Sequence, residues 1–232
     1  MIVKDKRPAI AMIELIFAIV VMGIVMMSAP MLISTATQSV SVALQQEGIN
    51  EGSSRVSMIM TYAWDENDTN DSCIPPVLLT TVGDSELNIT ANHRRIGVPA
   101  SSNSRTFLCG ARELNASTTL GSEAGEVVED DLDDFSDTSL VLDTTGAGGK
   151  DYIETGTVNL ATNVNYIVDD ANYSNATITY TPGGTSGGTT NIKSITVIVT
   201  STSSASELKK NITLKAFSCN IGGYEFESRV FQ

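Results

Sequence analysis

Histidine, basic residues and cysteine are all scarce in this chain of 232 residues. A single histidine makes a metal site of several histidines, or a catalytic relay through histidine, unfavourable. Lys and Arg number 14 against 27 Asp and Glu, a formal net charge of −13, and this argues against nucleic-acid binding because phosphate contacts need basic side chains. Three cysteines without a Cys-x-x-Cys pair exclude a zinc ribbon. We also find neither a nucleophile–base–acid set nor a phosphate-binding glycine motif, and therefore expect no enzyme activity.

Charge is nearly absent from residues 8–46, where Glu14 is the one ionisable side chain. Residues 1–9 hold three basic residues and one acidic residue, a net charge of +2, and the apolar run Ile10–Ile33 follows. About 20 apolar residues span a bilayer as a helix. A basic flank stays in the cytoplasm. The pattern therefore predicts a single membrane pass over about 10–33, with the N-terminus inside and the bulk of the chain outside.

Three interpretations of this segment compete. A secretory signal has an apolar core of roughly 7–15 residues, which is shorter than this run, although Ser34 and Ala36 offer a small-residue cleavage site. A plain anchor leaves Glu14 unexplained, because a carboxylate deep in a membrane helix costs roughly 2.5–3.5 kcal/mol. The third interpretation gives Glu14 a role in assembly.

The stretch KRPAIAMIELIFAIVVMGIV resembles the leader and first helix of type IV prepilins and type II secretion pseudopilins. In that family a short basic leader ends in Gly or Ala. An apolar first mature residue, three more apolar residues, a glutamate and a long apolar helix follow. The resemblance places the cut between Ala9 and Ile10, makes Glu14 the fifth mature residue, and puts Gly23 at the family's helix glycine.

The resemblance implies that a prepilin peptidase removes the leader, residues 1–9, and methylates the new amine of Ile10. Glu14 lies about one helical turn further on, so it can pair with the Ile10 amine of a neighbouring subunit and set the axial register. The implied partners are copies of the chain or other pilin-like subunits, the peptidase, an inner-membrane assembly platform and membrane lipid. The implied location is the bacterial inner membrane with a periplasmic head, and later a filament or the cell surface.

Beyond the apolar run we expect one long helix over residues 10–63, which Gly48 and Gly52 weaken by about 1 kcal/mol each, and a head over residues 64–232. The fold class is α+β, with the helix packed on an antiparallel β-rich head in a pilin-like arrangement. Tyr180–Lys193 is typical of a hairpin with a glycine-rich loop. The candidate strands are Leu87–Ala91, Thr106–Cys109, Leu140–Leu142, Val164–Asp169, Thr177–Thr181, Ile192–Thr200 and Ile212–Cys219.

The head holds a dense acidic segment, Glu126–Asp137, and a second acidic loop, Trp64–Asp71. Oxygen ligands this dense suit Ca²⁺, and some pseudopilins bind calcium in the head. The alternative, which we favour, is a solvated acidic loop. Trp64 is expected to fill the helix–sheet junction. The candidate calcium ligands are Glu129, Asp130, Asp131, Asp133, Asp134 and Asp137.

Two kinds of covalent modification are expected in the head. In an oxidising periplasm one disulfide forms among Cys73, Cys109 and Cys219, with three pairings open. Several Asn-x-Ser/Thr sites also have an acid two residues earlier, which looks like the acceptor of the bacterial oligosaccharyltransferase, although coincidence in an Asn/Asp-rich chain is the alternative. These candidate glycosylation sites are Asn67, Asn70, Asn88, Asn115 and Asn172.

The sequence thus predicts a structural subunit of a type II secretion pseudopilus or a type IV pilus-like filament. One alternative is a minor pilin whose head acts as an adhesin or in DNA uptake, and the acidic head weakens the DNA version. The other is a membrane-anchored periplasmic binding or hydrolase domain that never polymerises.

Overall fold

One helix dominates the molecule. The computed structural model describes residues 8–69, 73–98, 105–123, 125–126, 128–142, 157–202, 209 and 211–223. Helix α1 runs from Pro8 to Ile59, 52 residues, or about 80 Å at 1.5 Å per residue. Pro30 lies inside it. The helix ends in a turn in which the Tyr62 N–H donates to the Ile59 carbonyl at 3.1 Å, so it stops four residues before the predicted boundary at residue 63.

Four antiparallel strands form the main sheet of the head. They are β3 (Thr138–Leu142), β4 (Thr157–Tyr166), β5 (Ile192–Thr202) and β6 (Asn211–Cys219), in the spatial order β3-β4-β5-β6. Each strand therefore pairs with its neighbour in the chain. This confirms the predicted α+β class, with the long helix packed on an antiparallel sheet.

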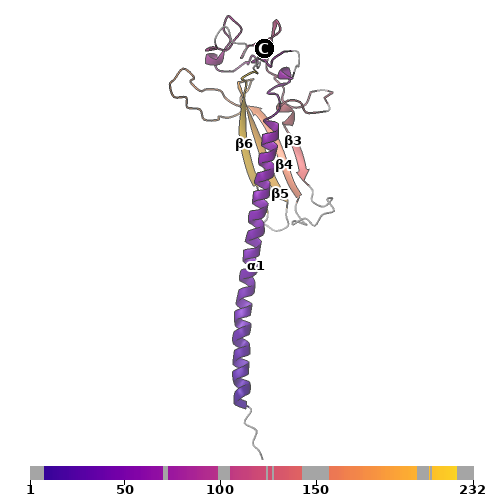
Figure 1. The fold of residues 1–232 in the computed structure, drawn as a ribbon, viewed down its shortest axis with the longest axis vertical. Helices are drawn as coiled ribbons and strands as arrows, with labels where there is room; N and C mark the ends of the chain where they lie inside the picture. Colours follow the sequence, from indigo (N-terminus) through magenta and orange to yellow (C-terminus); the bar gives the residue numbers. More distant parts are fainter. Residues whose placement is uncertain are drawn as a thin grey trace, which may run out of the picture.

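The second half of α1 packs against β5 and β6, while its first half projects beyond the sheet as an isolated rod (Figure 1). On β5 the side chains of Ile195, Val197 and Val199 alternate inward, as expected of a strand with one face on the core. The buried residues of this core are Ile59, Leu132, Phe135, Leu160, Val164, Ile195, Val197 and Val199.

Short elements build the end of the head beyond the helix. These are the two-residue strands β1 (Leu108–Cys109) and β2 (Arg112–Glu113) and the 3-10 turns η1 (Glu66–Asp68), η2 (Ser85–Leu87) and η3 (Asp133–Phe135). Trp64 is buried here among Leu78, Ala116 and Tyr166, at the helix–sheet junction as predicted. A disulfide joins Cys73 to Cys109, with Cα atoms 5.4 Å apart, and leaves Cys219 as a free thiol.

Several strand predictions are wrong. Leu87–Ala91 forms the end of η2 and one isolated bridge, and Thr177–Thr181 forms no strand because its Ile178 is exposed and no neighbouring strand pairs with it. The predicted hairpin over Tyr180–Lys193 does not form. Instead β5 pairs with β4, and residues 167–191 connect these two strands.

The other strands differ from prediction mainly in their bounds. β4 begins seven residues before the predicted Val164, since pairing of Leu160 with the buried Val199 outweighs the weak strand preference of the asparagines in between. β1 keeps only the last two residues of the predicted Thr106–Cys109, and β3 begins two residues before Leu140.

Candidate functional site

The first half of α1 exposes nearly all of its apolar surface. Between Met12 and Ile33 the large hydrophobic side chains are between 53% and 83% exposed. An 18-residue window of this helix reaches a mean hydropathy of 2.5 with none of it buried, so α1 is long and apolar enough to cross a membrane. Soluble monomers rarely expose contiguous apolar patches above a few hundred Å². Such a surface is suited to contact with lipid or other protein, and the segment is consistent with a membrane anchor or a signal sequence.

Glu14 interrupts this apolar surface near the N-terminal end of α1. Its side chain is exposed, and the next acidic residue along the helix is Glu47. The backbone is helical from Pro8 onward, so residue 10 lies about 6 Å below Glu14 along the axis. Residues 1–7, and the side chains of Ala9 and Ile10, lie outside the described residues, so the leader cut and the methylation site remain predictions.

Hydroxyl groups in the middle of α1 bond back to the helix itself. Ser28 Oγ donates to the Val25 carbonyl at 3.0 Å, and Thr35 Oγ1 donates to the Met31 carbonyl at 2.9 Å. Thr37 Oγ1 bonds the carbonyl of Ile33 in the same way. Such bonds satisfy a hydroxyl without water. The helix can therefore stay covered by lipid or protein for about one turn beyond Ile33.

Two glycines four residues apart bring the helix close to the sheet. A Cβ added at Gly48 would lie 3.1 Å from Ile212 Cδ1, and one added at Gly52 would lie 2.9 Å from Val199 Cγ2 and overlap Leu214 Cδ1. In the sequence both glycines stand out only as residues that weaken the helix. Their spacing, which puts them on one face, was the signal that could have revealed a close contact.

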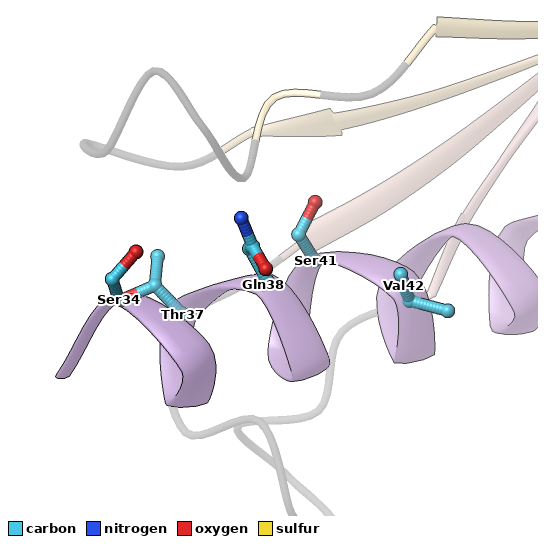
Figure 2. A pocket seen from close by; sticks show the side chains of 5 residues that line it. All are labelled: Ser34, Thr37, Gln38, Ser41 and Val42. Carbon is cyan, nitrogen blue, oxygen red and sulfur yellow. The ribbon is translucent and has the colours of Figure 1, made fainter. Parts of the chain in front are cut away.

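A groove of about 750 Å³ runs along α1 where the helix leaves the head. Figure 2 shows Ser34, Gln38 and Ser41 projecting from one side of the helix. Thr37 and Val42 complete the lining. None of these five residues ionises, so the described part of the lining offers hydrogen-bonding groups and no charged side chain.

The acidic segment is partly buried. Asp131, Asp133 and Asp134 are at most 2% exposed, so the expectation of a solvated loop is wrong for them. They are buried because η3 turns the segment inward beside the core residue Phe135. Glu129 and Asp137 remain exposed, and Asp137 Oδ1 accepts a hydrogen bond from Asn163 Nδ2 at 2.7 Å.

Two overlapping groups of carboxylates could hold a metal ion. One is Glu66, Glu126 and Asp130, the other is Glu123, Glu126 and Asp134, and in each group the ligand oxygens lie within 4.8 Å of one another. Calcium binds oxygen at about 2.3–2.6 Å, so oxygens on opposite sides of the ion lie about 5 Å apart, and both groups fit. Burial, and then the neighbouring Asp130, raise the pKa of Glu66. Of the six predicted ligands, only Asp130 and Asp134 take part.

The candidate glycosylation sites differ in access. Asn88, Asn115 and Asn172 are exposed, whereas Asn67 is half-buried and its Nδ2 donates to the Asn115 carbonyl at 3.0 Å. Asn70 lies outside the described residues. An acceptor amide must be free to react, so the first three sites are the accessible ones, and glycosylation stays a prediction.

No protein-family model, no curated protein and no solved structure matches this chain. The class therefore rests on the fold alone. A long apolar N-terminal helix packed through its second half on an antiparallel sheet is a pilin-like architecture.

Proposed function

We propose that this chain is a prepilin-like structural subunit that is anchored by α1, processed by a prepilin peptidase, and assembled into a type II secretion pseudopilus or a type IV pilus-like filament. One observation carries the proposal. The helix displays an uncharged and mainly apolar surface from Leu15 to Ile33, and a single carboxylate, Glu14, lies at its N-terminal end. A surface of this kind is suited first to lipid and then to the helices of neighbouring subunits.

Glu14 has a defined task in this proposal. Cleavage between Ala9 and Ile10 creates a positively charged amine one helical turn below the carboxylate. When helices bundle away from water, Glu14 of one subunit pairs with the Ile10 amine of the next, and each charge offsets the burial cost of the other. A misaligned neighbour leaves both charges unpaired, which costs several kcal/mol in an apolar medium. The pair therefore favours one axial register.

The head has the complementary task of covering the second half of the helix. Gly48 and Gly52 seat β5 and β6 on α1, and the sheet ends before the apolar half begins. Heads held in this way lie outside a helix bundle and leave its apolar surface free for neighbours. The other partners in this proposal are the inner-membrane assembly platform and other pilin-like subunits.

The first test is mass analysis of the N-terminus of the mature protein in its native host. A start at N-methyl-Ile10 supports the proposal, and an intact Met1 overturns it. The second test compares Glu14→Ala with Glu47→Ala, an exposed carboxylate further along the same helix. We expect Glu14→Ala to disappear from sheared filaments while Glu47→Ala remains. If neither variant changed filament incorporation and the leader stayed uncleaved, the results would instead favour an anchored domain that does not polymerise.

A further inference from the structure

A lysine is completely buried at the end of the head beyond the helix. Lys193 lies on β5 with 0% exposure, and its Nζ donates to the Trp64 carbonyl at 2.7 Å and to Asp65 Oδ2 at 3.0 Å. It also forms a very short contact with Asp133 Oδ1. The rings of Trp64 and Tyr166 lie 4.4 and 5.3 Å from Nζ. An ammonium group held this far from water is costly unless its surroundings neutralise it.

The two carboxyls that touch Lys193 differ in their other partners. Asp65 accepts hydrogen bonds from the Ser117 N–H at 2.9 Å, from Ser117 Oγ at 2.9 Å and from Tyr166 Oη at 3.3 Å, so both of its oxygens already have partners other than Lys193. Asp133 is 1% exposed, and its Oδ2 has no hydrogen-bond partner among the residues that the structure describes. Among the described residues of the sheet, Lys193 is the one whose side chain bonds to Asp133.

A third buried carboxyl completes the cluster. Asp131 is 0% exposed, its Oδ1 accepts from the Asp133 N–H at 2.7 Å, and its carboxyl lies beside that of Asp133. Three carboxyls thus surround one amine in an apolar site. Asp133 is thus held against the Lys193 amine with a second carboxyl, that of Asp131, beside it. A carboxyl that touches an amine in a site closed to water is the reactant pair for amide formation.

We propose that Lys193 and Asp133 join through an intramolecular amide bond between Nζ and Cγ, with Asp131 carrying the proton that the reaction moves. Asp65 acts as a positioning residue that holds the amine through its own hydrogen bond. The bond links β5 to η3 across 60 residues of chain. It goes beyond the proposed function and does not depend on it.

The reaction needs no oxidant, reductant or cofactor. The ammonium first gives one proton to the Asp133 carboxylate that it touches, which leaves a neutral amine and a protonated Asp133. The nitrogen lone pair then forms a bond to Cγ, and the bond from Cγ to its hydroxyl oxygen breaks. The hydroxyl leaves with a second amine proton, relayed by Asp131, as one water molecule. The remaining N–H of the amide can still donate to Asp65 or to the Trp64 carbonyl.

The amide bond is a covalent crosslink close to the C-terminal end of α1. Trp64 and Asp65 follow the end of α1 after a turn of four residues, and Asp133 and Lys193 come from two segments further along the chain. A neutral amide also removes a buried charge pair, which the ion pair would leave in place. If a force were applied to the head through α1, this bond would therefore oppose unfolding at this end of the head.

The test is mass spectrometry of the full-length protein, purified in detergent, reduced and denatured. We expect a mass lower than the sequence mass by one water molecule. We also expect loss of tryptic cleavage after Lys193, and a branched peptide that joins the Asp133 and Lys193 segments. Asp131→Asn should abolish the water loss while Asp137→Asn, an exposed neighbour, should keep it.

Two outcomes overturn the proposal. If the protein had the full sequence mass and trypsin cleaved normally after Lys193, Lys193 and Asp133 would form an ion pair only. This measurement uses the wild-type chain, so it does not depend on whether a variant folds. A water loss with the branch mapped to Asp65 would refute the assignment to Asp133.

Discussion

The contact between Gly52 and the sheet gives a sharp test of how the head is seated. The perturbation is Gly52→Ala, which adds one methyl group where the helix touches β5 and β6. The new Cβ would lie 2.9 Å from Val199 Cγ2 and would overlap Leu214 Cδ1. Leu214 can rotate its flexible end away, but Val199 is β-branched and stiff at χ1, so the strand or the helix must shift.

The magnitude follows from two opposing terms. Overpacking in a well-packed core costs about 1–3 kcal/mol. Replacing a helical glycine by alanine gains about 1 kcal/mol. Gly48→Ala is the matched control, because its Cβ would lie 3.1 Å from the mobile Ile212 Cδ1 and needs only a small adjustment. Both variants share the propensity gain, so we expect Gly52→Ala to be less stable than Gly48→Ala by about 1–3 kcal/mol.

Urea unfolding in detergent, followed by tryptophan fluorescence, measures this difference. Trp64 is the single tryptophan, and its Nε1 donates to the Ser218 carbonyl on β6 at 3.3 Å, so its emission reports on the junction between helix and sheet. Adding Leu214→Ala to Gly52→Ala should recover part of the loss, since it removes one of the overlapping atoms. If Gly52→Ala were as stable as Gly48→Ala, the close seating of the helix on the sheet would be refuted.

Two further predictions concern the acidic groups of the head. Burial, and then Asp65, raise the pKa of Asp68 to about 7, against a partial offset from Lys193. The folded state therefore binds this proton more tightly than the unfolded chain, and its contribution is complete below about pH 4 and is lost as the pH rises to about 7. We expect the urea midpoint in chelator-treated buffer to fall over this range, and to fall less in Asp68→Asn; an equal fall in both would contradict the assignment. Calcium should raise the unfolding midpoint of the wild-type chain but not of Glu126→Gln, because Glu126 belongs to both carboxylate groups. If calcium did not raise the midpoint of the wild-type chain, the hypothesis of a calcium site in the head would be refuted.

The helix and two of the four main strands were readable from the sequence because their signals are local. The apolar run Ile10–Ile33 is long enough to specify a helix by itself. β5 and β6 show the alternation of a half-buried strand, and the predicted Ile192–Thr200 differs from β5 by two residues. The first half of β4 had no such signal, since Asn159, Ala161 and Asn163 favour other conformations, and only pairing with β5 decides its state.

The interior of the head could not be predicted from the sequence, because its contacts join segments that are far apart in the chain. Nothing local selects Cys73–Cys109 over the other two pairings, because the two cysteines are 36 positions apart in the sequence and only the fold brings them together. Lys193 did carry a signal that was missed. It shares the inward face of β5 with Ile195 and Val197, so the alternation already required a buried carboxyl partner. Which carboxyl takes this place is decided only by the turn η3, which buries Asp133.

The length of α1 fits both an anchored and an assembled state. Gly48, the first glycine that seats the sheet, lies 34 residues beyond Glu14, which is about 50 Å of helix. The hydrocarbon core of a bilayer is about 30 Å thick. About 20 Å of helix therefore remains between the lipid and the sheet, and its hydroxyls at Thr35 and Thr37 bond to the helix itself. In the proposed anchored state this spacer would keep the head clear of lipid headgroups. In the proposed filament the same spacer would let apolar helices bundle without collision between heads, so one helix length would serve both steps of the proposed assembly.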